Sequence, residues 1–289
     1  MVRNIILLGL ILLSFGYGCK NSNQQNKVQT RIDSLKNEQE IVNFIKEKFT
    51  EIELKNISLN SALPIFALEN KSPRWSVNDV DENGYNDLII NLNLNNTYYS
   101  YVVLADSNKY SIISLTSIWE YAGSFSKFDT IKKQPVIILA GYELGNTLRM
   151  DTLVCKFGAF IDFNPTPTNN KVNKIEMHLS ALGAESDHVP NINANIDFDR
   201  DSSSCHKWFS NPAYKDFQYS IDKVEMKKLK NILQYADLSR LKRRDHDTKT
   251  DQPSSKIKIY SDQKPLEVSD YGLEGSYTLR EMYKIVYKY

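Results

Sequence analysis

The hydrophobic and polar positions divide the chain into an apolar leader, a short polar stretch and two longer patterned regions. In the leader, an almost unbroken apolar run from Ile5 to Phe15 follows a single cation, Arg3, and ends at the small residue Gly18. A short cationic start, an apolar centre and a small-residue exit are typical of a signal peptide, and this run is too short to cross a hydrocarbon core comfortably. We therefore predict that residues 1–18 are a signal peptide.

The region 33–163 is predicted to hold one helix followed by strands. Apolar residues recur every three or four positions from Ile41 to Ile52, which indicates a helix from about Asp33 to Ile52. Later runs are short, rich in β-branched and aromatic residues and bounded by Asn, Ser, Asp or Gly, as expected of antiparallel strands. These runs are 87–94, 97–105, 109–115, 134–142 and 151–163.

A polar stretch at 164–173, rich in Pro and Asn, is predicted to be a linker. The region 174–289 then contains further strand patterns, a helix that begins after Asp222 and a closing helix from Thr278. Strands with segregated helices favour the α+β class. The predicted fold is therefore an N-terminal helix plus a mostly antiparallel β domain (33–163), followed by a smaller α+β domain (174–289). The strand patterns of the second region are 174–182, 191–199, 256–262 and 266–272.

The charge of the chain gives no reason to expect nucleic acid as a partner. Lys and Arg total 36 and Asp and Glu total 35, and removal of residues 1–18 takes away only Arg3. The remaining chain has equal numbers of cations and anions, so it has no global field that attracts phosphate backbones.

Cys19 directly follows Gly18, and this junction resembles the lipobox of bacterial lipoproteins. The two residues before Gly18 depart from the usual lipobox, in which small residues follow a Leu, because they are Gly16 and Tyr17. The resemblance implies that Cys19 becomes the mature N-terminus, carries fatty acyl chains such as palmitate, and anchors the chain to the outer membrane of a bacterial cell envelope. Residues 19–32 would be a flexible tether to the periplasmic or the surface face. An ordinary cleaved signal peptide with an incidental Cys, or a short anchor helix, is the alternative.

The segment 79–90 has oxygen-bearing side chains at alternate positions of a short loop, and Gly84 allows a sharp turn at its sixth position. A hard cation such as Ca²⁺ binds six to eight oxygens, which such a loop can direct inward. The alternative is a plain acidic turn, in which three neighbouring carboxylates would repel one another. The predicted ligands are Asp79, Asp81, Asn83, Asp87 and the backbone carbonyl of Tyr85.

The loop differs from an EF-hand because its twelfth position is Ile90 and because a strand pattern follows it. It resembles the D-x-D-x-[DN]-G-x-x-D-[LI] loops of FG-GAP and related β-repeat proteins, which lead straight into a strand. The resemblance covers about a dozen residues in a single copy. It implies a structural Ca²⁺ and does not imply a whole propeller.

The region 174–289 resembles an uncharacterised domain-of-unknown-function family of bacterial envelope lipoproteins. The most specific match is the closing pattern D-Y-G-x-x-G-x-x-x-L, which contains Asp270, Tyr271, Gly272, Gly275 and Leu279. The family often carries a Cys- and Pro-rich stretch after its first strand, and residues 180–191 contain no Cys. The resemblance brings no activity with it.

Other reactive side chains form no recognisable catalytic pattern. Cys155 lies in an apolar strand pattern and Cys205 in a polar segment expected to be a loop. An oxidising compartment would allow a disulfide between them, but a buried free thiol at Cys155 is the commoner outcome. The four histidines show no ligand spacing, and alternating acidic residues at 197–201 are expected at a solvated hairpin end.

Two functions are compatible with the sequence. The first is a non-enzymatic binding or structural protein of the cell envelope, anchored by lipid, with an unknown envelope protein or glycan as its partner. The second is a glycan hydrolase of the envelope that uses Asp or Glu side chains around 79–87 or 197–201. A concave pocket with two carboxylates about 5–10 Å apart would favour the hydrolase.

Overall fold

The computed structural model describes residues 29–49, 57–59, 74–94, 97–115, 124–143, 147–181, 190–241, 252–262, 264–273 and 275–288. The predicted signal peptide, Cys19 and most of the predicted tether lie outside these residues. Within the described ranges, no helix has the length and apolar content needed to cross a membrane.

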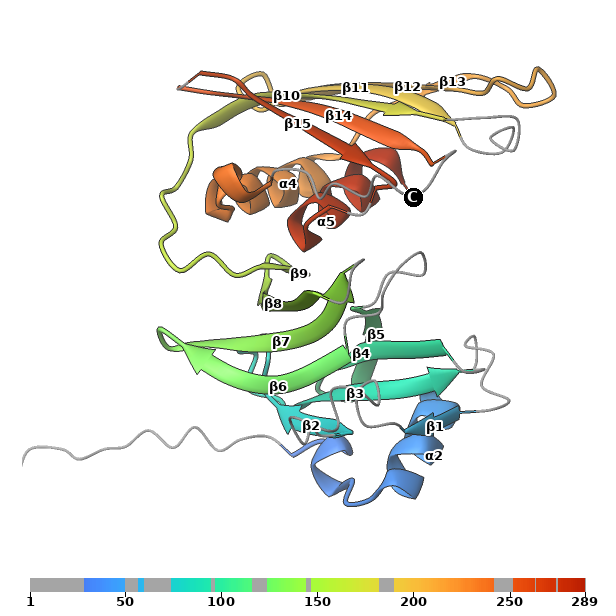
Figure 1. The fold of residues 1–289 in the computed structure, drawn as a ribbon, viewed down its shortest axis with the longest axis vertical. Helices are drawn as coiled ribbons and strands as arrows, with labels where there is room; N and C mark the ends of the chain where they lie inside the picture. Colours follow the sequence, from blue (N-terminus) through green and yellow to red (C-terminus); the bar gives the residue numbers. More distant parts are fainter. Residues whose placement is uncertain are drawn as a thin grey trace, which may run out of the picture.

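The described strands form three antiparallel sheets (Figure 1). In the first, β1 and β2 both pair with one edge of β3, and β4 and β5 follow on its other side. Its strands are β1 (Ile57–Leu59), β2 (Trp75–Asn78), β3 (Asp87–Leu94), β4 (Thr97–Asp106) and β5 (Lys109–Ser114). The second is a meander of β6 (Ser124–Ile131), β7 (Gln134–Glu143), β8 (Thr147–Lys156) and β9 (Ala159–Asp162).

The third sheet has six strands in the order β13-β12-β11-β10-β14-β15. Side chains alternate along its strands between a buried face and an exposed face, as the period-2 patterns of the sequence predict. The strands are β10 (Val172–Ser180), β11 (Asn191–Asp197), β12 (Ser202–Trp208), β13 (Phe217–Tyr219), β14 (Ser254–Ser261) and β15 (Leu266–Tyr271).

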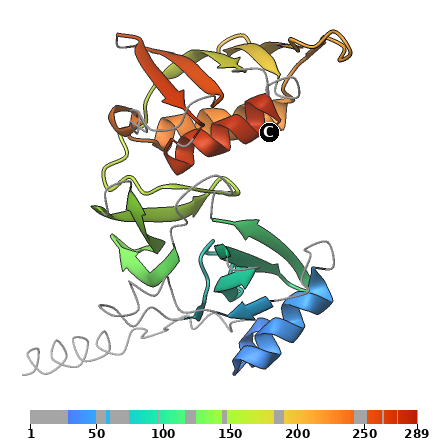
Figure 2. The same ribbon diagram turned by 45° about the vertical axis from the view of Figure 1, so that its right-hand side comes forward.

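Two helices, α4 (Lys223–Tyr235) and α5 (Tyr277–Tyr287), cover the buried face of the six-stranded sheet (Figures 1 and 2). As predicted, the carboxylate of Asp222 caps α4 by accepting a hydrogen bond of 2.8 Å from the backbone N–H of Glu225. The core beneath the helices continues into the second sheet, where it includes Val154 and Ile161. The helices therefore lie between the third sheet and the rest of the chain.

The helix α2 (Glu38–Lys48) packs against the first sheet through Ile41, Phe44 and Ile45. It is shorter than the predicted span from Asp33 to Ile52, and it is not the N-terminal element because the 3-10 turn η1 (Ile32–Ser34) precedes it. The cause is local, since the side chain of Asn37 accepts a hydrogen bond from Glu40 N and so starts the helix at Glu38.

The strand β3 has buried apolar residues at consecutive positions because both of its faces are covered. Leu88 and Ile90 belong to the same core as the buried residues of α2, whereas Ile89 belongs to the core between the first and second sheets. This arrangement explains why the segment DLIINL has no clean alternation, although an exposed face is common in antiparallel sheets.

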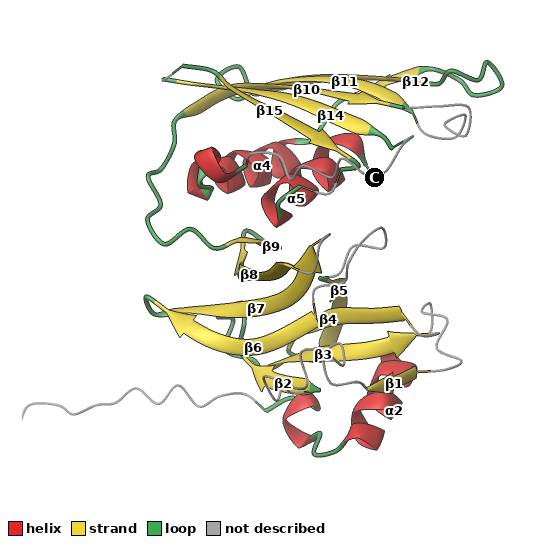
Figure 3. Cartoon of the chain, viewed as in Figure 1, coloured by secondary structure: helices red, strands yellow, loops and turns green. Residues whose placement is uncertain are grey.

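The α+β class is compatible with the structure, which is mainly β with some helix (Figure 3). The predicted strand 151–163 is in fact the two strands β8 and β9, joined by a tight turn at Phe157 and Gly158, both with positive φ. Cys205 was expected in a loop but lies in β12, which pairs with β11 over its full length. The predicted linker is tied to the end of α4, because Asn164 Nδ2 donates to Tyr235 O at 2.8 Å.

Candidate functional site

The candidate metal-binding loop connects β2 to β3. These strands pair directly, with Asn78 opposite Asp87, so the intervening residues are held in a closed turn. Gly84 has a φ of +90°, as the sequence predicts, and a Cβ atom there would meet no atom within 4 Å. Glycine is therefore favoured at this position by backbone conformation and not by lack of space. Val80 is buried in the core between the first and second sheets and holds the loop in place.

Three carboxylates of this loop converge. Asp79 and Asp81 are half-buried and Asp87 is fully buried, and one oxygen of each lies within 4.8 Å of the others. These three side chains could hold a metal ion. The structure thus confirms the predicted acidic cluster at these positions. The cluster does not by itself identify the ion.

Backbone N–H groups orient each carboxylate. Asp79 accepts hydrogen bonds from Asn83 N at 3.1 Å and Gly84 N at 3.0 Å. Asp87 accepts one from Val80 N at 2.8 Å and one from Ala105 N at 2.9 Å. Such bonds favour the ionised form and fix the direction in which the remaining lone pairs point.

The other two predicted ligands lie in the loop but outside the group of three carboxylates. Asn83 Nδ2 donates to Asp81 Oδ2 at 3.1 Å and to Ala105 O at 2.7 Å, and its Oδ1 accepts from Tyr85 N at 2.8 Å. In this arrangement the amide nitrogen of Asn83, and not its oxygen, faces Asp81. The side chain of Tyr85 packs against the core beneath α2.

The electrostatics of the loop favour a cation. Burial, together with the charges of Asp81 and Asp79, raises the pKa of Asp87 to about 7, although the two backbone N–H groups lower it. Burial likewise raises the pKa of Asp81, with contributions from the charges of Asp79 and Asp106. Asp106, at the end of β4, is a nearby acidic residue that the loop sequence does not reveal because it lies on another strand. A bound cation would stabilise the ionised form of each carboxylate.

The loop borders a surface hollow of about 450 Å³ between β2 and the β6–β7 hairpin. The hollow keeps one side of the loop open to solvent. Its lining residues are Val77, Asn78, Asp79, Glu82, Asn86, Phe128, Thr130, Lys133 and Pro135.

The remaining residues considered in the sequence are placed apart from this loop. Cys155 in β8 and Cys205 in β12 are both free thiols, and burial raises the pKa of each. Asp197 accepts hydrogen bonds from the turn between β11 and β12, and Asp201 pairs with Lys223 at 2.7 Å. These residues form the solvated hairpin end that was predicted.

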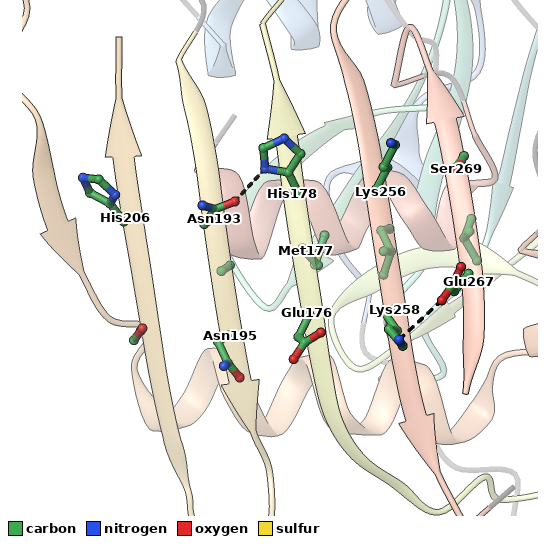
Figure 4. Close-up of a pocket in the computed structure, with 14 residues that line it drawn as sticks. Glu176, Met177, His178, Asn193, Asn195, His206, Lys256, Lys258, Glu267 and Ser269 are labelled. Atoms are coloured by element: carbon green, nitrogen blue, oxygen red, sulfur yellow. Dashed lines mark hydrogen bonds and ion pairs between the residues drawn. The ribbon is translucent and has the colours of Figure 1, made fainter. Parts of the chain in front are cut away.

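A second feature, which the sequence patterns did not predict, is a hollow of about 470 Å³ on the exposed face of the six-stranded sheet (Figure 4). The hollow crosses five strands, from β12 to β15, and most of the residues that line it have polar side chains. The only local signal was the alternation of polar residues along each strand, which is also what a plain solvated sheet face would show.

These features define a mainly β protein with some helix, in three antiparallel sheets, whose β2–β3 loop carries an acidic cluster able to hold a metal ion. No protein-family model, curated protein or solved structure matches the chain. The resemblances of residues 79–90 and 174–289 therefore stay predictions.

Proposed function

We propose that this chain is a lipid-anchored protein of the bacterial cell envelope, a non-enzymatic binding or structural module in which the loop 79–87 binds one Ca²⁺. The observation that carries the calcium site is the convergence of Asp79, Asp81 and Asp87 to within 4.8 Å. Oxygens on opposite sides of a Ca²⁺ lie about 5 Å apart, so one ion can bridge all three.

The donor set favours calcium over softer metals, because the loop offers oxygen ligands and no thiolate or imidazole. The role of the ion is structural. Asp87 accepts backbone hydrogen bonds from Val80 and Ala105, so an ion on Asp87 stabilises the loop together with the ends of β3 and β4.

Thermal unfolding of the full-length chain tests the site. After dialysis against EDTA, addition of Ca²⁺ at ten times its Kd should stabilise the native state by about 1.4 kcal/mol and raise the midpoint. Asp81→Asn should abolish the rise because it removes a charged ligand and keeps the shape of the side chain. Asp199→Asn, at the exposed β11–β12 hairpin, is the matched control and should respond like the native chain. An equal rise in all three, or none at millimolar Ca²⁺, would contradict the site.

The anchor is supported by the leader pattern and by Cys19, and it needs a separate test. Mass spectrometry of the mature chain should give an N-terminus at residue 19 that carries acyl chains. Cys19→Ala should move the protein from the membrane fraction to the soluble fraction. An unmodified thiol, or unchanged membrane association of Cys19→Ala, would rule out lipid as the tether.

A glycan hydrolase is the second candidate, because the hollow on the six-stranded sheet contains two carboxylates. Glu176 on β10 and Glu267 on β15 are separated by one strand, which corresponds to roughly 10 Å between their backbones. A hydrolase needs one carboxyl with a raised pKa as its acid. Here Glu176 accepts from Lys174 Nζ at 2.7 Å and from Tyr260 OH at 2.8 Å, which lowers its pKa. Binding without hydrolysis is therefore the function that we favour.

A further inference from the structure

The exposed face of the six-stranded sheet presents polar side chains in two rows that run across the strands. Strand register places His206, Asn193, His178, Lys256 and Ser269 side by side on β12, β11, β10, β14 and β15. One pleat further along, the second row consists of Ser204, Asn195, Glu176, Lys258 and Glu267. Figure 4 shows both rows on the same side of the sheet, and the 470 Å³ hollow lies over them.

The first row is held together at its centre. His178 Nδ1 and Asn193 Oδ1 are 2.6 Å apart, so the imidazole orients the amide (Figure 4). Beside them, the rings of His206 and Trp208 stack with their centroids 5.2 Å apart, and the His178 ring is 6.3 Å from the Trp208 ring. The row thus ends in a group of planar rings next to an oriented amide.

The composition of this face departs from that of an ordinary solvated sheet. Asn is depleted in strands, yet Asn193 and Asn195 occupy the exposed positions of β11, one of the inner strands. Residues that conflict with local propensity are expected where function requires them. The rows carry amide, hydroxyl and imidazole groups, all of which can both donate and accept hydrogen bonds in a neutral state.

The charges of the hollow cancel. Its lining includes two cations, Lys256 and Lys258, and two anions, Glu176 and Glu267. Lys258 lies between the two carboxylates and pairs with Glu267 at 3.4 Å. A polyanion drawn to Lys256 would meet the carboxylates of the neighbouring row, so this face has no net attraction for either sign of charge.

We propose that this face binds a neutral polysaccharide, with the sugar chain lying along the rows and across the strands. Vicinal hydroxyl groups of sugars both donate and accept hydrogen bonds, which matches the amides, hydroxyls and imidazoles of the rows. The apolar face of a sugar ring can contact the rings of His206 and Trp208. The five strands span roughly 19 Å, the length of a short oligosaccharide.

A protein partner is less favoured by the same observations. Cores of protein interfaces are enriched in aromatic and other apolar residues and depleted of charge. The outward side chains of the two rows include four charged residues, and the buried aliphatic residues of these strands face the helices.

Isothermal titration of the full-length chain with chitohexaose, cellohexaose and maltohexaose tests the proposal, and heparin serves as the anionic comparison. We expect measurable binding to at least one neutral hexasaccharide. Asn193→Ala should weaken it about tenfold through loss of the oriented amide, and Asn195→Ala should also weaken it. Asn43→Ala, an exposed asparagine on α2, is the matched control and should bind like the native chain. Asn193 and Asn195 are both exposed, so the melting temperatures of the variants should stay unchanged.

Each other outcome would overturn the proposal. These outcomes are no binding to any of the three hexasaccharides, equal binding by Asn193→Ala, Asn195→Ala and native chain, or binding to heparin alone. The ion loop is on a different sheet, so the affinity for sugar should be the same in Ca²⁺ and in EDTA. Failure of the chain to bind Ca²⁺ would therefore leave the sugar-binding proposal standing. Failure to bind sugar would likewise leave the calcium site standing.

Discussion

The backbone N–H of Ala105 donates a hydrogen bond of 2.9 Å to the buried carboxylate of Asp87. The other oxygen of the same carboxylate accepts the N–H of Val80 at 2.8 Å. Asp87 thus joins the acidic loop to the strand β4, and it is also one of the three carboxylates that converge. Ion binding and the stability of the first sheet should therefore be coupled through this side chain.

The stability of the metal-free chain should depend on pH through Asp87. Its pKa is about 7 in the folded state, above the unfolded value near 3.9, so the folded state holds the proton more tightly. Stability from this group is full below about pH 4 and falls as pH rises to about 7, at about 1.4 kcal/mol per pH unit at most. Urea unfolding in EDTA should give a lower free energy of unfolding at pH 8 than at pH 5.

Calcium should cancel this loss, because an ion on the ionised carboxylate removes the preference for the proton. Asp87→Asn should flatten the same part of the pH profile in EDTA, since the amide does not titrate. A profile in EDTA that is equally steep with and without the substitution would show that another group causes the dependence.

Gly275→Ala should destabilise the chain by about 1–3 kcal/mol through overpacking. A Cβ atom at this position would lie 2.5 Å from Leu279 Cδ1 and 2.6 Å from Asp270 Oδ2. The Asp270 carboxylate also accepts the N–H of Gly275 at 2.9 Å and the hydroxyl of Tyr283 at 2.7 Å, so it cannot move freely. This packing explains why Asp270, Gly275 and Leu279 occur together in the closing pattern of the sequence.

Urea unfolding of Gly275→Ala and Gly158→Ala provides the comparison. Gly158 has a φ of +70° and no atom within 4 Å of an added Cβ, so its substitution introduces backbone strain alone, about 1 kcal/mol. If Gly275→Ala lost no more stability than Gly158→Ala, close packing would not be the reason for glycine at position 275.

Asn91→Leu should destabilise the contact between the first and second sheets. Asn91 is buried in β3, where its Nδ2 donates to Phe125 O and its Oδ1 accepts from Phe125 N, both at 2.9 Å. A leucine leaves the carbonyl of Phe125 without this donor, which costs about 1–3 kcal/mol for the buried group. Urea unfolding would measure this loss of stability, and the dependence of the unfolding free energy on urea concentration should stay unchanged. The control is Asn43→Ala, which alters an exposed asparagine and should change stability by less than about 0.5 kcal/mol.

The thiol of Cys155 should react with iodoacetamide only after unfolding. Burial raises its pKa to about 12 and that of Cys205 to about 11, so almost no thiolate exists at pH 8. In Cys19→Ala, mass spectrometry should find no modified thiol in buffer and two in urea. Rapid labelling of the native chain would show that one of these sites is open, and a mass lower by two hydrogens would indicate a disulfide.

Much of the local structure follows from the sequence because its causes lie within a few residues. The cap at Asp222, the turn at Gly84 and the strand patterns that form β10 and β14 were all predicted, and each depends on neighbours along the chain. The convergence of Asp79, Asp81 and Asp87 was predictable for the same reason, since one short loop carries all three.

Tertiary structure decided the features whose partners lie far apart in the chain. Nothing near Asn91 indicates that it bonds to Phe125, and nothing near Cys205 indicates a strand until β11 pairs with β12. The two polar rows of the six-stranded sheet come from five strands, and their order is set by which apolar faces the helices α4 and α5 bury. Period and propensity act over a few residues, whereas burial depends on the whole fold, so only the folded chain places these side chains together.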